Sequence, residues 1–424
     1  MASDLRSAPV ARSVAEIERA LTGIWAQAAA RRAKDAAGGK SAAGDEGAGA
    51  PGGTSPDAAV RVGEHHVAAR SSVLNLVVVA GHQETAERCA ATIAGIAGRH
   101  PSRSLIISAV DVDGPAGIEA RIEAISVATA SGTAESGAET IHITTRGETS
   151  RHLASIIVPL LVHDLPVALW WPHNPDFLSH RARRLLPMAD RLIVDSATWS
   201  GDGLNRLAAM SAVAQSQRLA VADFSLIRQD RWREALASVY DLPDLRPHLS
   251  AVRSITVRYA AADGADPTGL TNVARPVYHV SWLASRLGMT VVSPLQRLPD
   301  GRRTATLRQG THQVAVELRP ARSDLADGST VGVEIASQLR GAELIGDVQA
   351  GDRTVEVTVR DQGRERVHRT YLAPRLNDVE LLELAVEDNL AGSVGVEALA
   401  MAGHLISAEP PHGAADMRRS EDYD

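Results

Sequence analysis

Leu165-Pro-Val-Ala-Leu-Trp-Trp-Pro172 is the most unusual stretch of this sequence, and Arg191-Leu-Ile-Val-Asp-Ser196 follows it closely. Aromatic residues make up only 3% of the chain, so two adjacent tryptophans stand out. The two prolines bracket a short apolar run, which favours a buried strand over a helix. Because side chains alternate across a strand, Trp170 and Trp171 must face opposite sides of the sheet.

The carboxyl end of this predicted strand is the first candidate for a functional surface. In open α/β sheets, ligands collect at the rim beyond the carboxyl ends of the strands. The strand at 192–194 ends in Asp195, so the rim would also carry a carboxylate if the two strands are neighbours. The predicted binding residues at this rim are Trp170, Trp171, Pro172, His173 and Asp195. Alternatively, the two rings simply cap the two hydrophobic layers of the sheet.

Strand and helix patterns alternate from residue 71 to about residue 245. This alternation predicts an α/β domain with a largely parallel sheet and helices on both faces. The expected strands are residues 74–79, 104–110, 122–128, 140–145, 166–170 and 192–195, and the expected helices are residues 85–98, 149–161, 177–188 and 204–214.

A different rhythm follows, in which apolar residues alternate with Arg, Glu or Thr. This pattern is typical of an antiparallel sheet with one face on the core and the other exposed to solvent, so we expect a smaller α+β domain. The expected elements are strands at 255–259, 313–318 and 331–337, a helix opened by Pro276, a hairpin that turns at Asp361-Gln-Gly363, and a helix at 378–390.

A chain of 424 residues is long enough for two such domains plus flexible segments. The expected organisation is a helical arm at 1–33, a Gly/Ala-rich linker at 34–69, the α/β domain at 70–245, the α+β domain at 250–407 and a disordered tail at 408–424. The arm has apolar residues at helical spacing, which form an apolar stripe along one face of the predicted helix. This stripe docks either on this protein or on another chain.

The predicted helix between the two rim strands carries a pair of arginines. Arg181 and Arg184 are three residues apart and share its outward face, while Leu178, Leu185 and Leu186 form the inward face. Two arginines suit a phosphate or an acidic patch on a partner, although charges on an outward face are commonly just solvated. We therefore add Arg181 and Arg184 to the predicted partner-binding residues.

Composition excludes several classes of function. A net charge of −7 gives no support to nucleic acid binding. The single Cys89 allows no internal disulfide, and neither a signal core nor a membrane-spanning apolar run is evident, so we expect a cytoplasmic protein that binds no membrane. Nucleophile-elbow, phosphate-loop and metal-ligand motifs are missing. We therefore predict no catalytic residues, no cofactor and no metal.

Several motifs, in order along the chain, resemble the glucose-6-phosphate dehydrogenase assembly proteins called OpcA. The resemblance rests on Val73-Leu-Asn-Leu-Val-Val-Val79, His100-Pro-Ser-Arg103, the stretch from Ile157 to Pro172, Asp190-Arg-Leu-Ile-Val-Asp-Ser196, Trp232-Arg-Glu234 and Trp282-Leu-Ala-Ser-Arg-Leu-Gly288. It implies that the partner is glucose-6-phosphate dehydrogenase and that the chain promotes the active oligomer of that enzyme without being an enzyme itself.

Two other classes of function remain open from the residues. One is an enzyme or sensor that binds a sugar phosphate or nucleotide at the α/β rim, as Arg181, Arg184 and Asp195 would allow. The other is a structural scaffold with a different partner, which the helical arm and the linker would suit.

Overall fold

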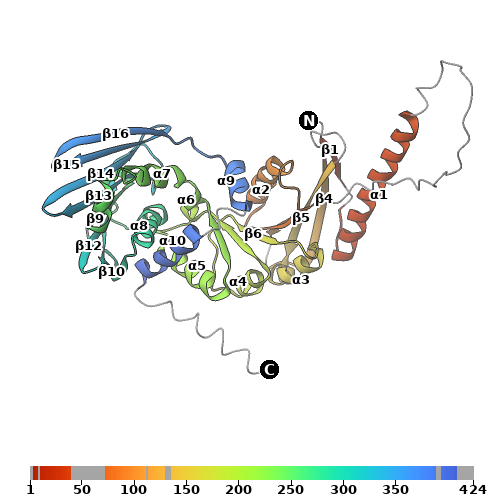
Figure 1. Ribbon diagram of the computed structural model, residues 1–424. Helices are drawn as coiled ribbons and strands as arrows, with labels where there is room; N and C mark the ends of the chain where they lie inside the picture. Colours follow the sequence, from red (N-terminus) through yellow and green to blue (C-terminus); the bar gives the residue numbers. More distant parts are fainter. Residues whose placement is uncertain are drawn as a thin grey trace, which may run out of the picture. The chain divides into compact units, whose positions relative to one another are not determined.

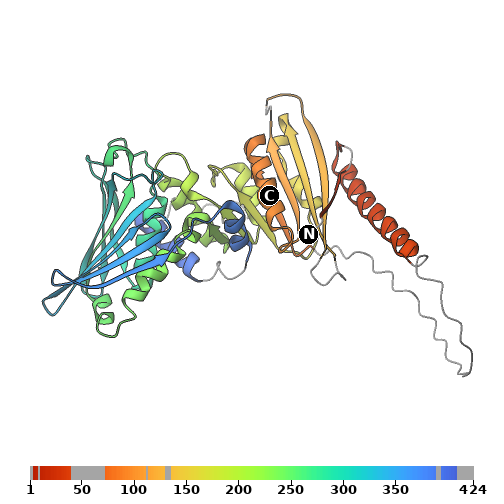
Figure 2. The ribbon, with the colours of Figure 1, turned by 90° about the horizontal axis from the view of Figure 1, so that it is seen from above.

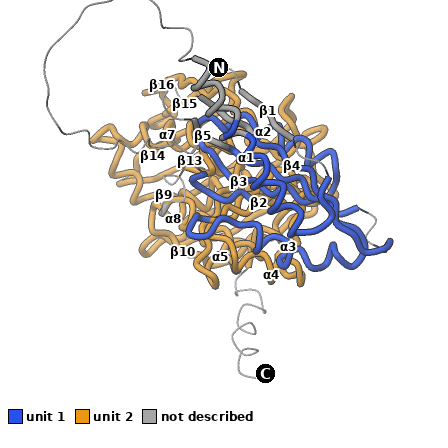
Figure 3. Tube along the Cα trace, turned by 90° about the vertical axis from the view of Figure 1, so that its right-hand side faces the viewer, with its two compact units in different colours: residues 1–77, 82–166 blue, residues 78–81, 167–424 orange. Residues whose placement is uncertain are grey.

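The computed structural model describes residues 3–7, 10–39, 72–110, 113–128, 135–387 and 393–407. The chain divides into two compact units, which Figure 3 colours separately. Unit 1 comprises Met1–Val77 and His82–Pro166, and unit 2 comprises Val78–Gly81 and Val167–Asp424. The predicted tail at 408–424 and most of the predicted linker at 34–69 lie outside the described residues. The predicted domain boundary between residues 245 and 250 stays a prediction.

The strands of unit 1 run in the order β1-β4-β5-β3-β2, and residues 78–80 at the end of β2 count with unit 2. Figure 1 labels β1, β4 and β5. Their bounds are β1 (Ser3–Ser7), β2 (Leu74–Ala80), β3 (Ser102–Ala109), β4 (Gly117–Ala128) and β5 (Glu135–Arg146). Strands β3 and β5 are parallel, as predicted, whereas β4 is antiparallel to both β1 and β5. The residues between β4 and β5 are too few for the crossover that a parallel pair requires.

Helix α1 (Val14–Gly39) packs on unit 1 through the first part of its predicted apolar stripe. Ile17, Leu21 and Ile24 are buried, and α1 contacts β4. The Ser13 side chain accepts a hydrogen bond from the Glu16 amide at the start of the helix. This part of the arm therefore docks on its own chain.

Unit 1 also contains helix α2 (Gln83–Ile96). The single helix predicted at 149–161 is instead a series of three short helical pieces. The pieces are η1 (Gly147–Arg151), α3 (Leu153–Ile157) and η2 (Val158–Leu160). Pro159 explains the break after α3, because proline cannot donate the backbone hydrogen bond that continues an α-helix. Cys89 lies in α2 and is buried, as its apolar surroundings predict.

Unit 2 opens with three parallel strands, β6 (Val167–Trp171), β7 (Arg191–Val194) and β8 (Ala220–Asp223). The first two confirm the predicted strands to within one residue, and the third was not predicted. The helical segments of this part are α4 (His180–Leu185), η3 (Leu186–Met188), η4 (Ser196–Thr198), α5 (Leu204–Gln217), α6 (Phe224–Ile227), α7 (Asp230–Val239) and η5 (Arg246–Ser250).

The second sheet of unit 2 has eight strands in the order β10-β11-β12-β9-β13-β14-β15-β16, and only β12 and β9 are parallel to each other. The strands are β9 (Val252–Ala260), β10 (Thr290–Arg297), β11 (Arg303–Gln309), β12 (His312–Ala321), β13 (Thr330–Leu339), β14 (Ala342–Ala350), β15 (Thr354–Asp361) and β16 (Arg364–Leu372). The mostly antiparallel sheet was predicted, although β10, β11 and β14 were not.

One face of this sheet is covered by helices. Helices α7 and α8 (Ala274–Arg286) contact it from the same side, as Figure 2 shows. Buried apolar residues alternate with polar residues of the other face, for example along β12 and β15. The predicted hairpin turn joins β15 to β16, with φ of 50° at Gln362 and 79° at Gly363. Two positive φ values in a row are what a tight two-residue hairpin turn requires.

The last part of unit 2 in the sequence forms two helices, whereas a single helix was predicted at 378–390. Helix α9 (Asp378–Val386) begins with a capping box formed by Asn377 and Glu380, and α10 (Ser393–Ile406) packs on α5 and α8. Among the described residues, no helix combines the length and the apolar character needed to span a bilayer. The fold is thus a mixed α/β arrangement with mostly parallel strands followed by a mostly antiparallel sheet.

Candidate partner-binding site

The carboxyl ends of β6, β7 and β8 lie side by side in unit 2. Trp171 is in register with Val194, and Val194 is in register with Asp223. The condition under which Asp195 joins the rim of the tryptophan strand is therefore met, because β6 and β7 are neighbours. Because the three strands are parallel and in register, the residues that follow them share one rim.

The two tryptophans pack on different aromatic partners, as their alternation along β6 requires. The ring of Trp170 lies 6.1 Å from that of Phe224, and the ring of Trp171 lies 6.4 Å from that of Phe177. Phe177 in turn lies 6.0 Å from Trp199. Trp170 and Trp171 are only 4% and 7% exposed, so the two rings offer little surface for direct contact with another molecule.

The loop after β6 is tied to the loop after β7 by hydrogen bonds. The Thr198 hydroxyl donates to the Pro172 carbonyl over 3.4 Å, and the Ser200 amide donates to Asn174 Oδ1 over 2.7 Å. Pro172 and His173 are half-buried between these ties. The rim therefore presents a loop tied at two points, and the rings of Trp171, Phe177 and Trp199 pack edge to face beside it.

Asp195 is engaged in a partly buried ion pair with Arg228 rather than turned to solvent. Arg228 donates to both of its carboxylate oxygens, over 2.8 Å and 2.9 Å, and the Ser225 hydroxyl donates to Oδ1 over 3.4 Å. The guanidinium group also lies 5.9 Å from the centre of the Phe224 ring. Asp195 is 8% exposed, so its charge is used within the protein.

A second acidic residue, Asp223, fixes the rim from the end of β8. Its Oδ1 accepts hydrogen bonds from the amides of Ser196 and Ser225, over 3.0 Å and 2.9 Å. Its Oδ2 accepts one from the hydroxyl of Tyr278, on α8, over 2.9 Å. Burial raises the pKa of Asp223 and holds the pKa of Tyr278 well above its usual value. These contacts anchor α8 against the ends of β7 and β8.

Sequence reasoning missed Asp223, Ser225 and Arg228 because it missed β8. A usable signal was present: both β7 and β8 are short apolar runs that end in an aspartate, with a serine one or two residues later. A second carboxylate at the same rim follows from that repetition.

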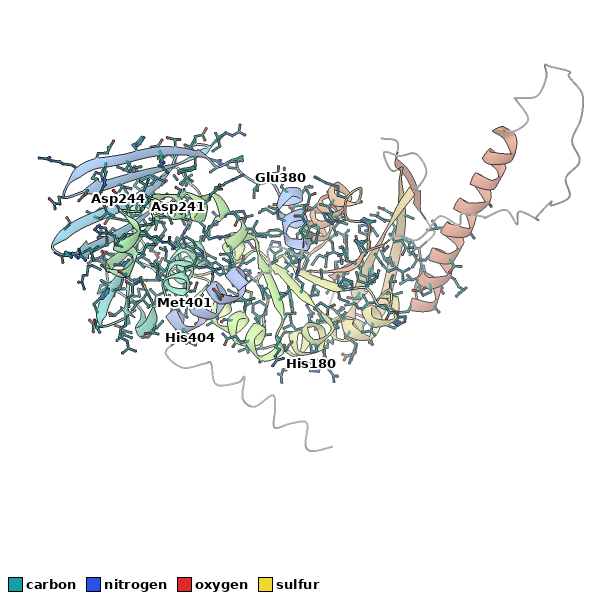
Figure 4. All side chains as sticks on the ribbon, in the orientation of Figure 1. His180, Asp241, Asp244, Glu380, Met401 and His404 are labelled. Carbon is teal, nitrogen blue, oxygen red and sulfur yellow. The ribbon has the colours of Figure 1, made fainter. Side chains whose placement is uncertain are left out.

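Helix α4 begins later than predicted, and this changes the position of one leucine. The Ser179 side chain caps the helix by accepting from the Ala182 amide, so the helix starts at His180, which Figure 4 labels. Leu178 therefore precedes the helix and is 64% exposed, which corrects its predicted place on the inward face. Leu185 and Leu186 are buried, as predicted.

The two predicted arginines of α4 differ in exposure. Arg184 is exposed and has no ion-pair partner among the described residues, while Arg181 is half-buried. An exposed arginine can contact a partner surface through both its charge and its apolar stem. Of the predicted binding residues, Arg184 is thus the most accessible.

His279 is a buried residue of α8 that sequence reasoning did not single out. It is fully buried, neither ring nitrogen has a hydrogen-bond partner among the described residues, and its ring lies 5.3 Å from that of Trp232. Burial, followed by the charges of Arg233 and Arg275, lowers its pKa to about 3. The imidazole is therefore neutral in the folded protein.

We expect stability to fall on acidification because of this histidine. Since its pKa is lowered on folding, its contribution is fully present above about pH 6.5, the pKa of an unfolded histidine, and is lost as pH falls towards 3. The unfolding free energy should drop by about 2 kcal/mol between pH 8 and pH 5 from this residue alone. Urea unfolding should show that His279→Leu removes this part of the pH dependence, whereas His404→Gln, an exposed change, retains it.

Comparison with known proteins places these elements in a family. Residues 93–212 match the model described as the glucose-6-phosphate dehydrogenase subunit N-terminal domain, and residues 219–385 match the corresponding C-terminal domain. Together the two matches cover more than half of the chain.

Two curated relatives are OxPP cycle proteins OpcA. The one from Synechocystis sp. is 29% identical over 36% of this chain, and the one from Nostoc punctiforme is 30% identical over 44%. The matched regions span only 30% and 38% of the length of those relatives.

Solved structures give only a weak similarity. The WlbA dehydrogenase of Thermus thermophilus is 12% identical, with a TM-score of 0.38 over 79% of this chain and 96% of that one. A mutant of Gal80p from Saccharomyces cerevisiae is 11% identical, with a TM-score of 0.40 over 78% of this chain and 93% of that one. Similarity at this level says nothing about activity. The two family matches, by contrast, cover both units, and the chain belongs to the OpcA family.

Proposed function

We propose that this protein is a non-enzymatic assembly factor and allosteric activator of glucose-6-phosphate dehydrogenase, and that it acts by binding the active oligomer. Family membership carries the proposal, since both matching domains are described as parts of a subunit of that enzyme. A binding protein shifts an equilibrium between two enzyme states only by the difference between its affinities for them. A tenfold activation requires a difference of about 1.4 kcal/mol.

The polar groups of the rim support a binding role. Asp195 and Asp223 are the carboxylates that a catalytic interpretation would use. Both are buried and held by side chains of the same unit, through Arg228 and Tyr278 respectively. In this arrangement they fix the loops of the rim, which makes the rim a rigid platform. Rigid surfaces bind partners with a smaller loss of conformational entropy.

We place the contact with the dehydrogenase on the segment that follows β6, with the exposed Leu178 and Arg184 and the half-buried Pro172 and His173. Arg184 would face an acidic patch of the enzyme, because arginine pairs with carboxylates through two parallel hydrogen bonds. The polar face of the second sheet is the competing surface. Arg360 lies on that face at the end of β15 and is exposed.

A binding experiment with the dehydrogenase of the same organism tests the function and the surface together. The wild-type chain should co-elute with the enzyme and raise its activity. Arg184→Glu should weaken binding at least about tenfold, because it replaces an attractive charge with a repulsive one at the interface. The matched variant Arg360→Glu should bind like the wild type.

Each other outcome has a definite meaning. Unchanged kinetics together with no co-elution of the wild type would remove the proposed function. Normal binding by Arg184→Glu and weak binding by Arg360→Glu would move the contact to the sheet face. If sugar phosphates or nucleotides raise the melting temperature of the chain alone, a small-molecule enzyme or sensor becomes the better explanation.

A further inference from the structure

A cavity of about 560 Å³ opens in unit 2 next to the rim, at a place that the proposed contact does not use. Three loops form it: the one after β7, the one between β9 and α8, and the one between β12 and β13. Its lining residues are Trp199, Gly201, Ala262, Asp263, Ala265, Asp266, Pro267, Thr268, Leu270, Thr271, Asn272 and Asp327. The volume lies within the range of ligand pockets in proteins, roughly 300–1,000 Å³.

The lining carries negative charge that its own side chains do not neutralise. It includes three aspartates and neither Lys nor Arg. Asp266 is buried and paired with Arg303 over 3.2 Å. Asp263 and Asp327 are exposed and have no ion-pair partner among the described residues. The nearby Arg297 is engaged with the Pro267 carbonyl. The cavity therefore favours a cationic occupant and disfavours a phosphate.

Apolar groups lie in the same lining. Leu270 belongs to the lining and is 66% exposed. Trp199 is 3% exposed, and its indole Nε1 has no acceptor among the described residues. The loop is held in place because the Asn272 side chain donates to the carbonyls of Ser196 and Trp199, over 2.8 Å and 2.9 Å. The cavity is thus a fixed shape that combines apolar walls with two unpaired carboxylates.

We propose that this cavity receives an arginine side chain of the partner polypeptide. An arginine has an apolar stem that can lie along Leu270, and a planar guanidinium group that can donate paired hydrogen bonds to Asp263 or Asp327. The identity of the partner rests on the proposed function, whereas the class of occupant follows from the cavity. Binding through Arg184 on one side and an acidic cavity on the other would also fix the orientation of the partner.

Variants that neutralise the two unpaired carboxylates test the proposal by their affinity for the dehydrogenase. The double variant Asp263→Asn/Asp327→Asn should bind the enzyme at least about tenfold more weakly and show a smaller loss of affinity with added salt. Asp324→Asn removes one negative charge from an exposed position in the β12–β13 loop outside the lining, and it should bind like the wild type, whereas each single variant, Asp263→Asn or Asp327→Asn, should bind more weakly. Wild-type affinity in the double variant overturns the proposal. Failure of the wild type to bind would instead count against the proposed function.

A second measurement needs no enzyme. The chain has six tryptophans, and the indole N–H signal of Trp199 can be assigned with Trp199→Phe. N-acetyl-argininamide should shift this signal in the wild type, and the uncharged citrulline analogue should not. The double variant should respond to neither. An unmoved signal in the wild type would overturn the proposal even if the double variant binds the enzyme weakly, because the carboxylates would then act only as long-range charges.

Discussion

Replacement of Asp266 by asparagine is expected to lower the unfolding free energy of the protein by about 3–5 kcal/mol. Asp266 is 3% exposed and is the nearest counter-ion of Arg303, which is 1% exposed. Arg303 Nη1 donates to Asp266 Oδ2 over 3.2 Å, and Nη2 donates to the Gly269 carbonyl over 2.9 Å. The next carboxylate, that of Asp202, lies 3.6 Å away and is partly exposed. Removing the charge of Asp266 therefore leaves a buried guanidinium group poorly compensated.

Tyr259 belongs to the same network and cannot replace the lost charge. Its hydroxyl lies 3.2 Å from Arg303 Nη1 and 3.3 Å from Asp266 Oδ2. Burial raises the pKa of Tyr259 to about 12, so the hydroxyl stays protonated at neutral pH. A neutral hydroxyl can accept one hydrogen bond from Arg303, but it supplies no negative charge.

Urea unfolding followed by tryptophan fluorescence measures this effect in unit 2, where five of the six tryptophans lie. The double variant Asp266→Asn/Arg303→Met is the matched control. It should lose much less stability than Asp266→Asn alone, because no buried charge is left without a partner. A loss below about 1 kcal/mol for Asp266→Asn would contradict the expectation.

The rim could be predicted from sequence because its signals are local. A proline-bracketed apolar run and a run ending in aspartate predict strands, and parallel strands bring their carboxyl ends together. The position of Asp195 beside the end of β6 follows from this reasoning once the two strands are neighbours, and the pairing of β6 with β7 supplies that condition. The hairpin of β15 and β16 was predictable for the same reason, since its turn residues accept positive φ.

The polar partners of the rim were not predictable in this way. Arg228 and Tyr278 follow Asp195 and Asp223 by tens of residues, so which charge pairs with which depends on the packing of α6 and α8. Strand β8 was missed although it has the same four-residue length as β7, which was predicted; the repeated ending in aspartate and serine was the signal that distinguished it. Leu178 was misplaced because Ser179, rather than a residue before Phe177, caps α4.

The burial of Trp170 and Trp171 also changes how the rim must be understood. The rarity of aromatic residues in this chain made the two tryptophans the first candidates for contact with a partner, yet both are buried and each ring packs on one aromatic neighbour of the same unit. Their contribution is to the shape of the platform, which the exposed residues then use. The prediction that they take part in binding stays a prediction, and the enzyme-binding experiment on Arg184 tests the surface to which they belong.

Replacement of Arg103 by methionine is the second change with a large expected effect, again about 3–5 kcal/mol, in unit 1. Arg103 belongs to the His100-Pro-Ser-Arg103 motif and is 4% exposed. Its Nε donates to Glu139 Oε2 over 2.6 Å, and its Nη1 donates to the Leu160 carbonyl over 3.0 Å. The side chain therefore joins β3, β5 and the end of η2, and its loss leaves the carboxylate of Glu139, 2% exposed, without this partner.

Hydrogen exchange shows which strands lose stability in Arg103→Met, and unfolding followed by far-UV circular dichroism measures the loss of unfolding free energy. The amides of β3 and β5 should exchange faster in Arg103→Met, because the opening of unit 1 becomes less costly. Those of β13 and β14 in unit 2 should not change. Arg103→Met/Glu139→Met should recover most of the lost stability, because apolar side chains of similar volume can replace a buried ion pair. Helix α1 gives a further readout: Glu18 lies 3.7 Å from Arg103, so the start of the arm should also exchange faster. If Arg103→Met unfolds like the wild type, the buried ion pair does not stabilise unit 1, and the motif must be retained for another reason.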